Sequence, residues 1–139
     1  MRALVQRVSR ASVDVAGERV ATIGPGLLVL LGIAHDDTET QARWLADKVR
    51  ALRVFADAAG KMNEALGDRE ILCVSQFTLY GDTRRGNRPS YVDAAPPELA
   101  EPLYERFCEL AGAQRGVFGA MMAVELINDG PVTLLLESR

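Results

Sequence analysis

The sequence predicts an α+β fold, in which one domain combines two helices with a largely antiparallel sheet that curls toward a barrel. Three observations predict it. About six short segments have the apolar spacing of strands, two longer segments have the spacing of amphipathic helices, and no linker or internal repeat divides the 139 residues. A chain of this length buries a substantial core, so residues 1–139 are expected to form a single domain.

The first part of the chain is predicted to contain three strands. Residues 11–15 alternate apolar and polar side chains, which is the pattern of a half-buried strand. Residues 16–19 are typical of a hairpin turn, and residues 20–23 return as the partner strand. Gly24-Pro25-Gly26 then interrupts the chain before residues 27–31, which are apolar on both faces and are expected to form a central strand.

A helix is predicted after this strand. Asp36 or Thr38 can cap its N-terminus, because each is followed three residues later by an acid or amide, Glu39 or Gln41, at the capping-box spacing. The apolar residues beyond the cap recur at helical intervals and are expected to face the core: Ala42, Leu45, Ala46, Val49 and Leu52. A turn is predicted at residues 57–60.

The second half is predicted to begin with a strand over residues 71–80. Residues 81–95 contain glycine and proline without periodicity and are expected to form a loop. A second helix opens at Pro96-Pro97-Glu98, where the missing N–H of proline costs little. Its apolar stripe is Leu99, Leu103, Phe107 and Leu110. Strands at residues 117–127 and 132–136, joined by Asn128-Asp129-Gly130-Pro131, complete the fold.

Composition and charge place the chain among ordinary globular proteins. No apolar run approaches the roughly 20 residues that span a bilayer, and Met1-Arg2-Ala3 leads into a mixed polar stretch with no signal-peptide pattern. Cys73 and Cys108 lie in apolar patterns and are expected to be free buried thiols. These features predict a cytoplasmic protein.

The net charge of −3 does not by itself indicate nucleic-acid binding. Basic residues nevertheless gather in two places, Lys48, Arg50 and Arg53 in one and Arg84, Arg85 and Arg88 in the other. Such a cluster can grip a few phosphates, and it can equally be a solvated surface. Charge alone leaves both interpretations open.

The segment with the most chemical interest is Ser75-Gln76-Phe77-Thr78-Leu79-Tyr80, which ends an apolar run. It offers hydroxyls and an amide, yet none of its side chains ionises near pH 7. In a regular strand Gln76 and Thr78 would share one face while Ser75 and Phe77 shared the other, so backbone N–H groups would have to complete a polar site. The alternative is that Ser75 and Thr78 only satisfy neighbouring backbone groups.

Other kinds of site fit the sequence poorly. The single histidine, His35, stands beside Asp36 and Asp37 at a predicted helix start, where capping explains the acids, so no metal site is expected. Ser75 lacks the Gly-x-Ser-x-Gly elbow of a serine hydrolase, and neither cysteine has a dedicated histidine. Gly24-Pro25-Gly26 lacks the ending of a P-loop. Residues 128–131 read as an ordinary turn, and periodicity does not connect them with residues 75–80.

The chain closely resembles the D-aminoacyl-tRNA deacylase family. The likeness runs from the opening Arg2-Ala3-Leu4-Val5-Gln6-Arg7-Val8 through residues 26–32 and Gly60-Lys61-Met62-Asn63. Its two signature motifs are Ser75-Gln76-Phe77-Thr78-Leu79 and Asn128-Asp129-Gly130-Pro131-Val132-Thr133. Both motifs in this order are highly specific, and the resemblance implies the D-aminoacyl-tRNA deacylase-like fold.

The resemblance also implies a function. Family members hydrolyse the ester that joins a D-amino acid, or glycine mischarged on tRNA(Ala), to the terminal adenosine of tRNA, without a cofactor, and so proofread translation. They are homodimers in which a cis Gly-Pro pair enters the partner's pocket. Carried over, Gly130 and Pro131 would form a chiral gate facing Ser75, Gln76, Phe77 and Thr78 of the other subunit, with the latter four as catalytic residues.

Some alternatives stay open beside this hypothesis. Thr78 as a covalent nucleophile is the rival to polarisation of the ester by backbone N–H groups. A dimeric nucleic-acid-binding protein without turnover and a small-ester hydrolase using Ser75 are the rival functions. The chain also departs from the family pattern: Glu64–Glu70 and Cys108–Gly116 are shortened, and Val117 stands where members usually carry arginine.

Overall fold

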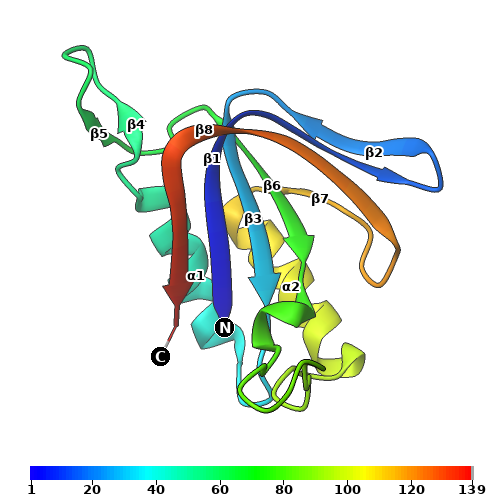
Figure 1. Ribbon diagram of the computed structural model, residues 1–139. Helices are drawn as coiled ribbons and strands as arrows, with labels where there is room; N and C mark the ends of the chain where they lie inside the picture. Colours follow the sequence, from blue (N-terminus) through cyan, green and yellow to red (C-terminus); the bar gives the residue numbers. More distant parts are fainter. Residues whose placement is uncertain (139) are drawn as a thin grey trace.

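The computed structural model describes residues 1–138, and a bent sheet dominates it (Figure 1). The long first strand β1 (Arg2–Val15) pairs antiparallel with β2 (Glu18–Ile23) and with β3 (Gly26–Gly32). The last strand β8 (Met122–Glu137) pairs antiparallel with β1 along its length, with register irregularities around Val8. These strands give the sheet its largely antiparallel, curled form, as the sequence predicts.

The remaining strands of the sheet run parallel to their neighbours. Strand β6 (Glu70–Ser75) pairs with β3, and the short β7 (Gln114–Arg115) pairs with β6. A separate two-stranded hairpin, β4 (Phe55–Ala56) and β5 (Met62–Glu64), projects from the top of the molecule. Asp57 closes its turn, since one carboxylate oxygen accepts hydrogen bonds from the backbone N–H groups of Ala59 and Lys61.

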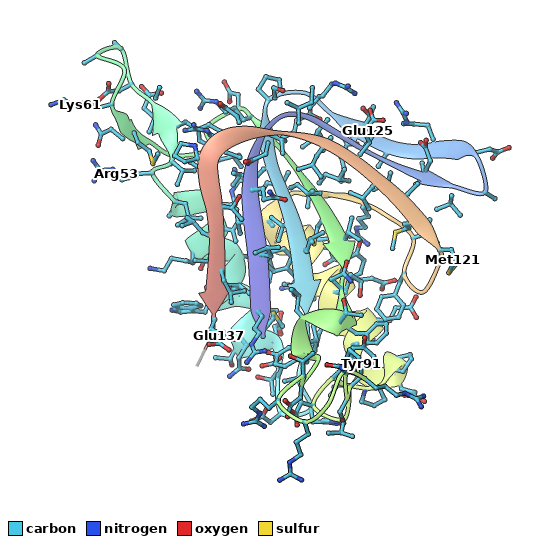
Figure 2. All side chains as sticks on the ribbon, viewed as in Figure 1. Arg53, Lys61, Tyr91, Met121, Glu125 and Glu137 are labelled. Atoms are coloured by element: carbon cyan, nitrogen blue, oxygen red, sulfur yellow. The ribbon has the colours of Figure 1, made fainter. Side chains whose placement is uncertain are left out.

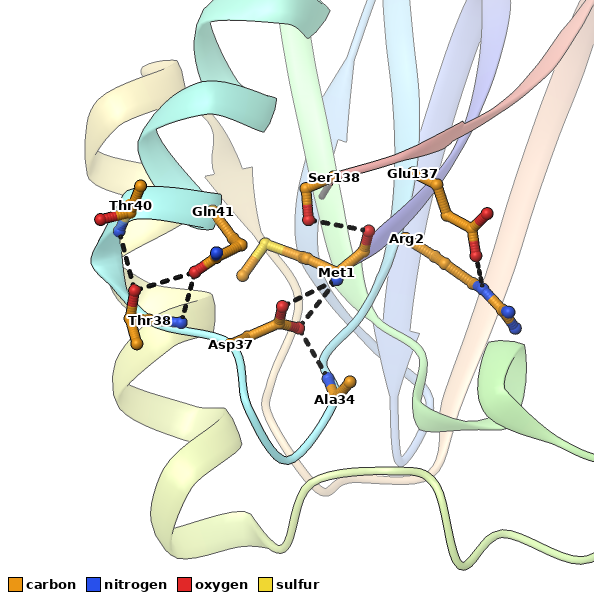
Figure 3. A network of polar contacts seen from close by, with 9 residues as sticks. All are labelled: Met1, Arg2, Ala34, Asp37, Thr38, Thr40, Gln41, Glu137 and Ser138. Atoms are coloured by element: carbon orange, nitrogen blue, oxygen red, sulfur yellow. Dashed lines mark hydrogen bonds and ion pairs between the residues drawn. The ribbon is translucent and has the colours of Figure 1, made fainter.

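Two helices cover one face of the sheet. Helix α1 (Glu39–Ala51) begins at Thr38, whose hydroxyl accepts from the Thr40 amide in a capping box with Gln41 (Figure 3). Helix α2 (Pro97–Ala111) ends at Gly112, which adopts the left-handed conformation. Of the predicted stripe Phe107 is fully buried, whereas its three leucines are only partly buried, and the other buried residues of the helix are Ala100, Tyr104, Cys108 and Ala111.

The sheet has a hydrophobic core on each face. The larger one lies between the sheet and the two helices, and it contains Val5, Val29 and Phe107. The smaller one lies inside the curl, where Val13, Leu28 and Val74 pack with the inner side chains of β8. Cys73 and Cys108 are both buried and free, as predicted. None of the helices within residues 1–138 is long and apolar enough to cross a membrane.

Three predicted element boundaries are wrong. The strand that ends in the polar segment stops at Ser75 instead of continuing to Tyr80, because its neighbour there, β3, ends at Gly32. The C-terminal strand begins at Met122, not at Val117, and it passes through residues 128–131 as an irregular stretch of one long strand. The first strand starts at Arg2, nine residues before the alternating pattern becomes visible at Ala11.

The acids after His35 differ in role from the prediction. Thr38 is the cap, and Asp37 is buried, where its carboxylate pairs with the α-ammonium of Met1 at 2.9 Å and accepts from the Ala34 amide at 2.7 Å (Figure 3). His35 contacts the carbonyl oxygen of Val92 through Nε2 at 2.7 Å. The His35 contact joins the loop over residues 81–95 to the segment that follows β3, and the Asp37 ion pair joins that segment to Met1.

Candidate active site

A cleft of about 1050 Å³ opens beside the end of β6. Its floor comes from β3 and β6, including Leu31 and Val74, and one wall comes from Tyr91 and the start of α2. The other wall comes from the β1–β2 turn and from residues 118–124, which carry Met121 (Figure 2). Ser75, Gln76 and Phe77 line the cleft, so three of the four predicted catalytic residues meet there.

The chain leaves β6 through a single 3₁₀ turn, η1 (Phe77–Tyr80). The Gln76 amide still bonds to the Leu31 carbonyl oxygen at 2.8 Å, after which the backbone turns and the Leu79 amide bonds to the Gln76 carbonyl oxygen at 3.2 Å. The first two N–H groups of a helical turn have no partner inside it. Within residues 1–138 the amides of Phe77 and Thr78 donate no hydrogen bond.

The side chains of this segment form a neutral polar group. Gln76 Nε2 donates to Thr78 Oγ1, so the threonine hydroxyl contacts an amide that cannot accept its proton. The two residues meet because of the turn and not because of strand alternation. Thr78 lies just outside the lining of the cleft, whereas the half-exposed ring of Phe77 packs edge-to-face against Tyr91 with 5.1 Å between ring centres.

Glycine at position 32 lets η1 fold back over the end of β3. A Cβ there would lie 3.1 Å from Leu79 Cβ and 3.2 Å from the Gln76 carbonyl oxygen, which is tighter than ordinary packing. Arg2 holds the turn from the other side: its Nη1 donates to the Leu79 carbonyl oxygen at 2.9 Å, and its guanidinium lies 4.5 Å from the centre of the Tyr80 ring. Partial burial, assisted by the charge of Asp37, raises the pKa of Tyr80 to about 12, so its phenol stays neutral at pH 7.

We expect Arg2→Ala to lower kcat/KM about tenfold for the ester hydrolysis that the family resemblance implies, because η1 loses its side-chain anchor and small displacements of reacting groups are costly. The loss of stability should be only about 1 kcal/mol, since the Arg2 side chain is partly exposed. Steady-state kinetics and thermal unfolding on the same preparation check both numbers. Glu137→Gln removes only the ion pair to Arg2 (Figure 3) and serves as the matched control; an equal loss of rate in both variants would contradict the role of Arg2 at η1.

The second motif forms a well-anchored turn in β8. Arg7 donates through Nε to the Asp129 carbonyl oxygen at 3.1 Å, through Nη2 to the Gly130 carbonyl oxygen at 3.2 Å, and through Nη1 to Val54. Asn128 Nδ2 spans the base of the turn, with the Arg7 and Val132 carbonyl oxygens each at 3.0 Å. The Gly130–Pro131 peptide bond is cis.

The first motif lies at one end of the sheet, whereas the second lies level with the middle of β1. Ser75 is level with Leu31 and hence with Ala3 of β1, whereas Asn128 is level with Val8 of β1. The five residues that separate Ala3 from Val8 span about 17 Å at about 3.3–3.4 Å per residue. Gly130 and Pro131 are therefore outside the cleft of their own chain, and they do not line it.

The structure adds residues that sequence reasoning did not select. Tyr91, Phe118 and Met121 line the cleft but come from segments without a pattern that distinguishes a site from a loop. Arg7 fixes the 128–131 turn, and its only signal is its place in the opening motif that resembles the family. Residues 1–138 contain no group of three or more His, Cys, Asp or Glu side chains that could hold a metal ion.

Comparisons with known proteins show the family of the chain. Residues 4–137 match the family described as D-Tyr-tRNA(Tyr) deacylase. The chain is 57% identical over 145 residues to a D-aminoacyl-tRNA deacylase of Myxococcus xanthus, covering 99% of this chain and 95% of the relative. It is 58% identical over 146 residues to a D-aminoacyl-tRNA deacylase of Anaeromyxobacter dehalogenans, covering 100% and 98%.

Two solved structures share the fold. One, described as a c-Myc DNA unwinding element binding protein, has a TM-score of 0.94 and 45% identity, with 100% of this chain and 99% of that chain covered. The other, described as a probable eukaryotic D-amino acid tRNA deacylase, has a TM-score of 0.85 at 17% identity, with 97% of each chain covered. At that identity the second likeness concerns the fold alone.

The family match and the curated relatives place this chain among the enzymes that hydrolyse ester bonds. More particularly, the chain belongs to the D-Tyr-tRNA(Tyr) deacylase family, whose curated relatives are D-aminoacyl-tRNA deacylases. Aminoacyl-tRNA is the substrate class of this family.

Proposed function

We propose that this protein hydrolyses the ester between a D-amino acid, or glycine carried by tRNA(Ala), and the terminal adenosine of tRNA, and that it proofreads translation in the cytoplasm. The observation that carries the proposal is the pair of free amides on Phe77 and Thr78 beside the cleft. Backbone N–H groups held in a fixed turn are the usual donors to the oxygen that becomes negative when an ester is attacked.

In the proposed chemistry these amides polarise the ester carbonyl, while Gln76 and Ser75 order the pocket. None of the four residues supplies a base, so the free ribose hydroxyl beside the ester is proposed to help activate the attacking water or the leaving oxygen. A single donor of this kind is worth about 10²–10³ in rate. A neutral pocket suffices because it acts on an ester that carries its own neighbouring hydroxyl.

We also propose that the active form is a homodimer with a site built across the interface. The offset of about 17 Å between the motifs along the strand direction supports it, because it separates Gly130 and Pro131 from Ser75 of the same chain. The edge strand β8 supports it too: among the described residues it pairs only with β1, and it exposes Ile127, Leu134 and Leu135.

The Gly130-Pro131 turn is proposed to act as a chiral gate that excludes L-aminoacyl esters. Discrimination of 10⁴-fold requires about 5.5 kcal/mol, whereas attractive recognition of one small apolar group supplies about 1–3 kcal/mol. A backbone turn that cannot move rejects the L side chain sterically and leaves the D side chain pointing out of the pocket. Arg7 and Asn128 give the 128–131 turn the required rigidity. Glycine, which has no side chain, passes the gate.

The test is incubation of the purified protein with D-tyrosyl-tRNA, L-tyrosyl-tRNA and glycyl-tRNA(Ala), followed by measurement of the remaining ester. We expect the D-ester and the glycyl ester to be hydrolysed and the L-ester to survive. Survival of the D-ester at stoichiometric enzyme would refute the proposed function. Equal hydrolysis of both tyrosyl esters would refute the steric gate while leaving the hydrolase.

Substitution of Thr78 distinguishes polarisation by backbone amides from nucleophilic attack by the hydroxyl. If the Thr78 amide polarises the ester, Thr78→Ala should keep the single-turnover rate within about threefold of the wild type, because the backbone N–H is retained. If the hydroxyl is the nucleophile, Thr78→Ala should lose at least about 10³ in rate, while Thr78→Ser, which keeps a hydroxyl, should remain active. We expect both variants to be active.

A nucleic-acid-binding protein without turnover is the second candidate. The structural relative at 45% identity, described as binding a DNA unwinding element, favours it. The same incubation discriminates the two functions, since a binding protein would protect every ester from hydrolysis instead of cleaving the D-ester. The anchored 128–131 turn favours the enzyme, because binding alone needs no gate.

A further inference from the structure

We infer that the loop tip formed by residues 83–88 binds the phosphodiester backbone of the tRNA nucleotides that precede the terminal adenosine in the cleft. This inference rests on the proposed function and names where its substrate is held. The tip contains Thr83, Arg84, Arg85, Gly86, Asn87 and Arg88, three cations without an acid. In Figure 1 the loop between η1 and α2 lies below the sheet, at the end where β6 delivers Ser75.

The loop tip is joined firmly to the site. Asp82 and Ser90 exchange backbone hydrogen bonds of 2.8 and 2.9 Å, which close the loop at its base. On one side this base follows η1 directly, and on the other it continues into Tyr91, which lines the cleft and packs against Phe77 (Figure 2). A chain that leaves the cleft past Phe77 and Tyr91 therefore meets the loop tip.

Two of the three arginines are not engaged by the protein. Arg84 is held by Asp82, which accepts from its Nε at 2.9 Å and its Nη2 at 2.7 Å, and this pairing lowers the pKa of Asp82 to about 2. Arg85 and Arg88 are exposed, and within residues 1–138 neither contacts an acceptor. Their planar donor groups match the oxygens of a phosphate.

The other basic cluster is occupied by structural contacts. Arg50 donates to the Ala111 carbonyl oxygen at 2.7 Å, Arg53 bonds to Asn63, and the Lys48 ammonium lies 5.5 Å from the centre of the Trp44 ring. Arg50 joins α1 to the end of α2, Arg53 holds the β4–β5 hairpin, and Lys48 contacts only a neighbour on its own helix. Of the two clusters, the loop tip is the one in which two exposed cations lack a contact with the described residues.

The remaining rims of the cleft are acidic or uncharged, so they do not attract a polyanion. The β1–β2 turn carries Asp14 and Glu18 against one cation, Arg19, which is itself paired with Asp14 at 2.7 Å. Residues 116–121 are uncharged. The first turns of α2 carry Glu98 and Glu101. Since the whole chain has a net charge of −3, binding of RNA needs a local cationic surface, and the 83–88 tip supplies one on a loop whose base continues into Tyr91 of the cleft.

The experiment compares the double variant Arg85→Gln/Arg88→Gln with Arg43→Gln/Lys48→Gln, which removes the same charge from exposed positions on α1. Two readouts are made: the affinity for uncharged tRNA as a function of salt, and hydrolysis of D-tyrosyl-tRNA and of 3′-D-tyrosyl-adenosine, which has no phosphate. The loop variant should bind tRNA about tenfold more weakly. The slope of the logarithm of the binding constant against the logarithm of the salt concentration should become shallower by about 1.4, the value for two single-strand phosphate contacts.

The loop variant should also raise KM for D-tyrosyl-tRNA about tenfold while hydrolysis of 3′-D-tyrosyl-adenosine and kcat stay unchanged. An equal loss on both esters would overturn the inference, because the tip would then only support the Tyr91 wall. Unchanged tRNA binding, or an equal loss in the α1 control, would overturn it as well. If the wild type binds tRNA through these arginines but cleaves no D-ester, the inference stands and the proposed function fails.

Discussion

Gly26→Ala should prevent the protein from folding. A Cβ at position 26 would lie 1.8 Å from the Glu70 carbonyl oxygen, 2.8 Å from its carbonyl carbon and 3.0 Å from its amide nitrogen. All three are backbone atoms, so no side-chain rotation relieves the clash. Gly26 and Glu70 begin the parallel pairing of β3 with β6, and the whole register would have to separate.

The expected loss exceeds about 4–5 kcal/mol, a size reached only when packing or backbone geometry fails, against a total stability of about 5–15 kcal/mol for such a domain. Soluble yield, far-ultraviolet circular dichroism and urea unfolding measure it. Gly24→Ala is the matched control, since a Cβ there meets no atom within 4 Å. A soluble Gly26→Ala protein with the wild-type unfolding midpoint would mean that β3 and β6 can move apart without cost.

This glycine illustrates what the sequence predicts and what it leaves out. Alternation at residues 11–15, the apolar run at 27–31 and the cap at Thr38 are local signals, and the structure confirms the elements that they predict. The parallel pairing of β3 with β6 joins residues about 45 positions apart, and no local pattern encodes it. Gly26 and Gly32 in the sequence look like ordinary interruptions, although each permits a close approach of backbone.

The candidate site likewise depends partly on local sequence signals and partly on contacts that form only on folding. Ser75, Gln76 and Phe77 could be chosen from the sequence because polar groups follow a buried strand, but their geometry depends on where that strand loses its neighbour. The free amides of Phe77 and Thr78 come from the 3₁₀ turn and carry no sequence signature. The cleft walls at Tyr91 and Met121 come from residues that become neighbours only after folding.

The second large effect is expected from mixing two inactive variants. Phe77→Pro removes one of the two free N–H groups at the first position of η1, where proline is tolerated, and should lower the rate about 10²–10³-fold. Gly130→Ala adds a methyl group to the proposed gate. Its Cβ would lie 3.7 Å from Asn128 Oδ1, an ordinary contact, so the fold should persist while the added methyl obstructs the partner's pocket.

A site built across a dimer interface predicts complementation between these variants. In a mixed dimer one site combines both defects, whereas the other pairs an intact η1 with an intact 128–131 turn. Random re-association should therefore restore about a quarter of the wild-type rate, and a purified heterodimer carrying two different tags should restore about half. A site contained within one chain predicts no recovery, because every chain then carries its own defect. Deacylation of D-tyrosyl-tRNA by the purified heterodimer, with each homodimer as control, decides between the two arrangements. A rate equal to the mean of the two homodimers would refute the cross-subunit site. Movement of β8 would then have to close the offset of about 17 Å along the strands that separates the motifs in one chain.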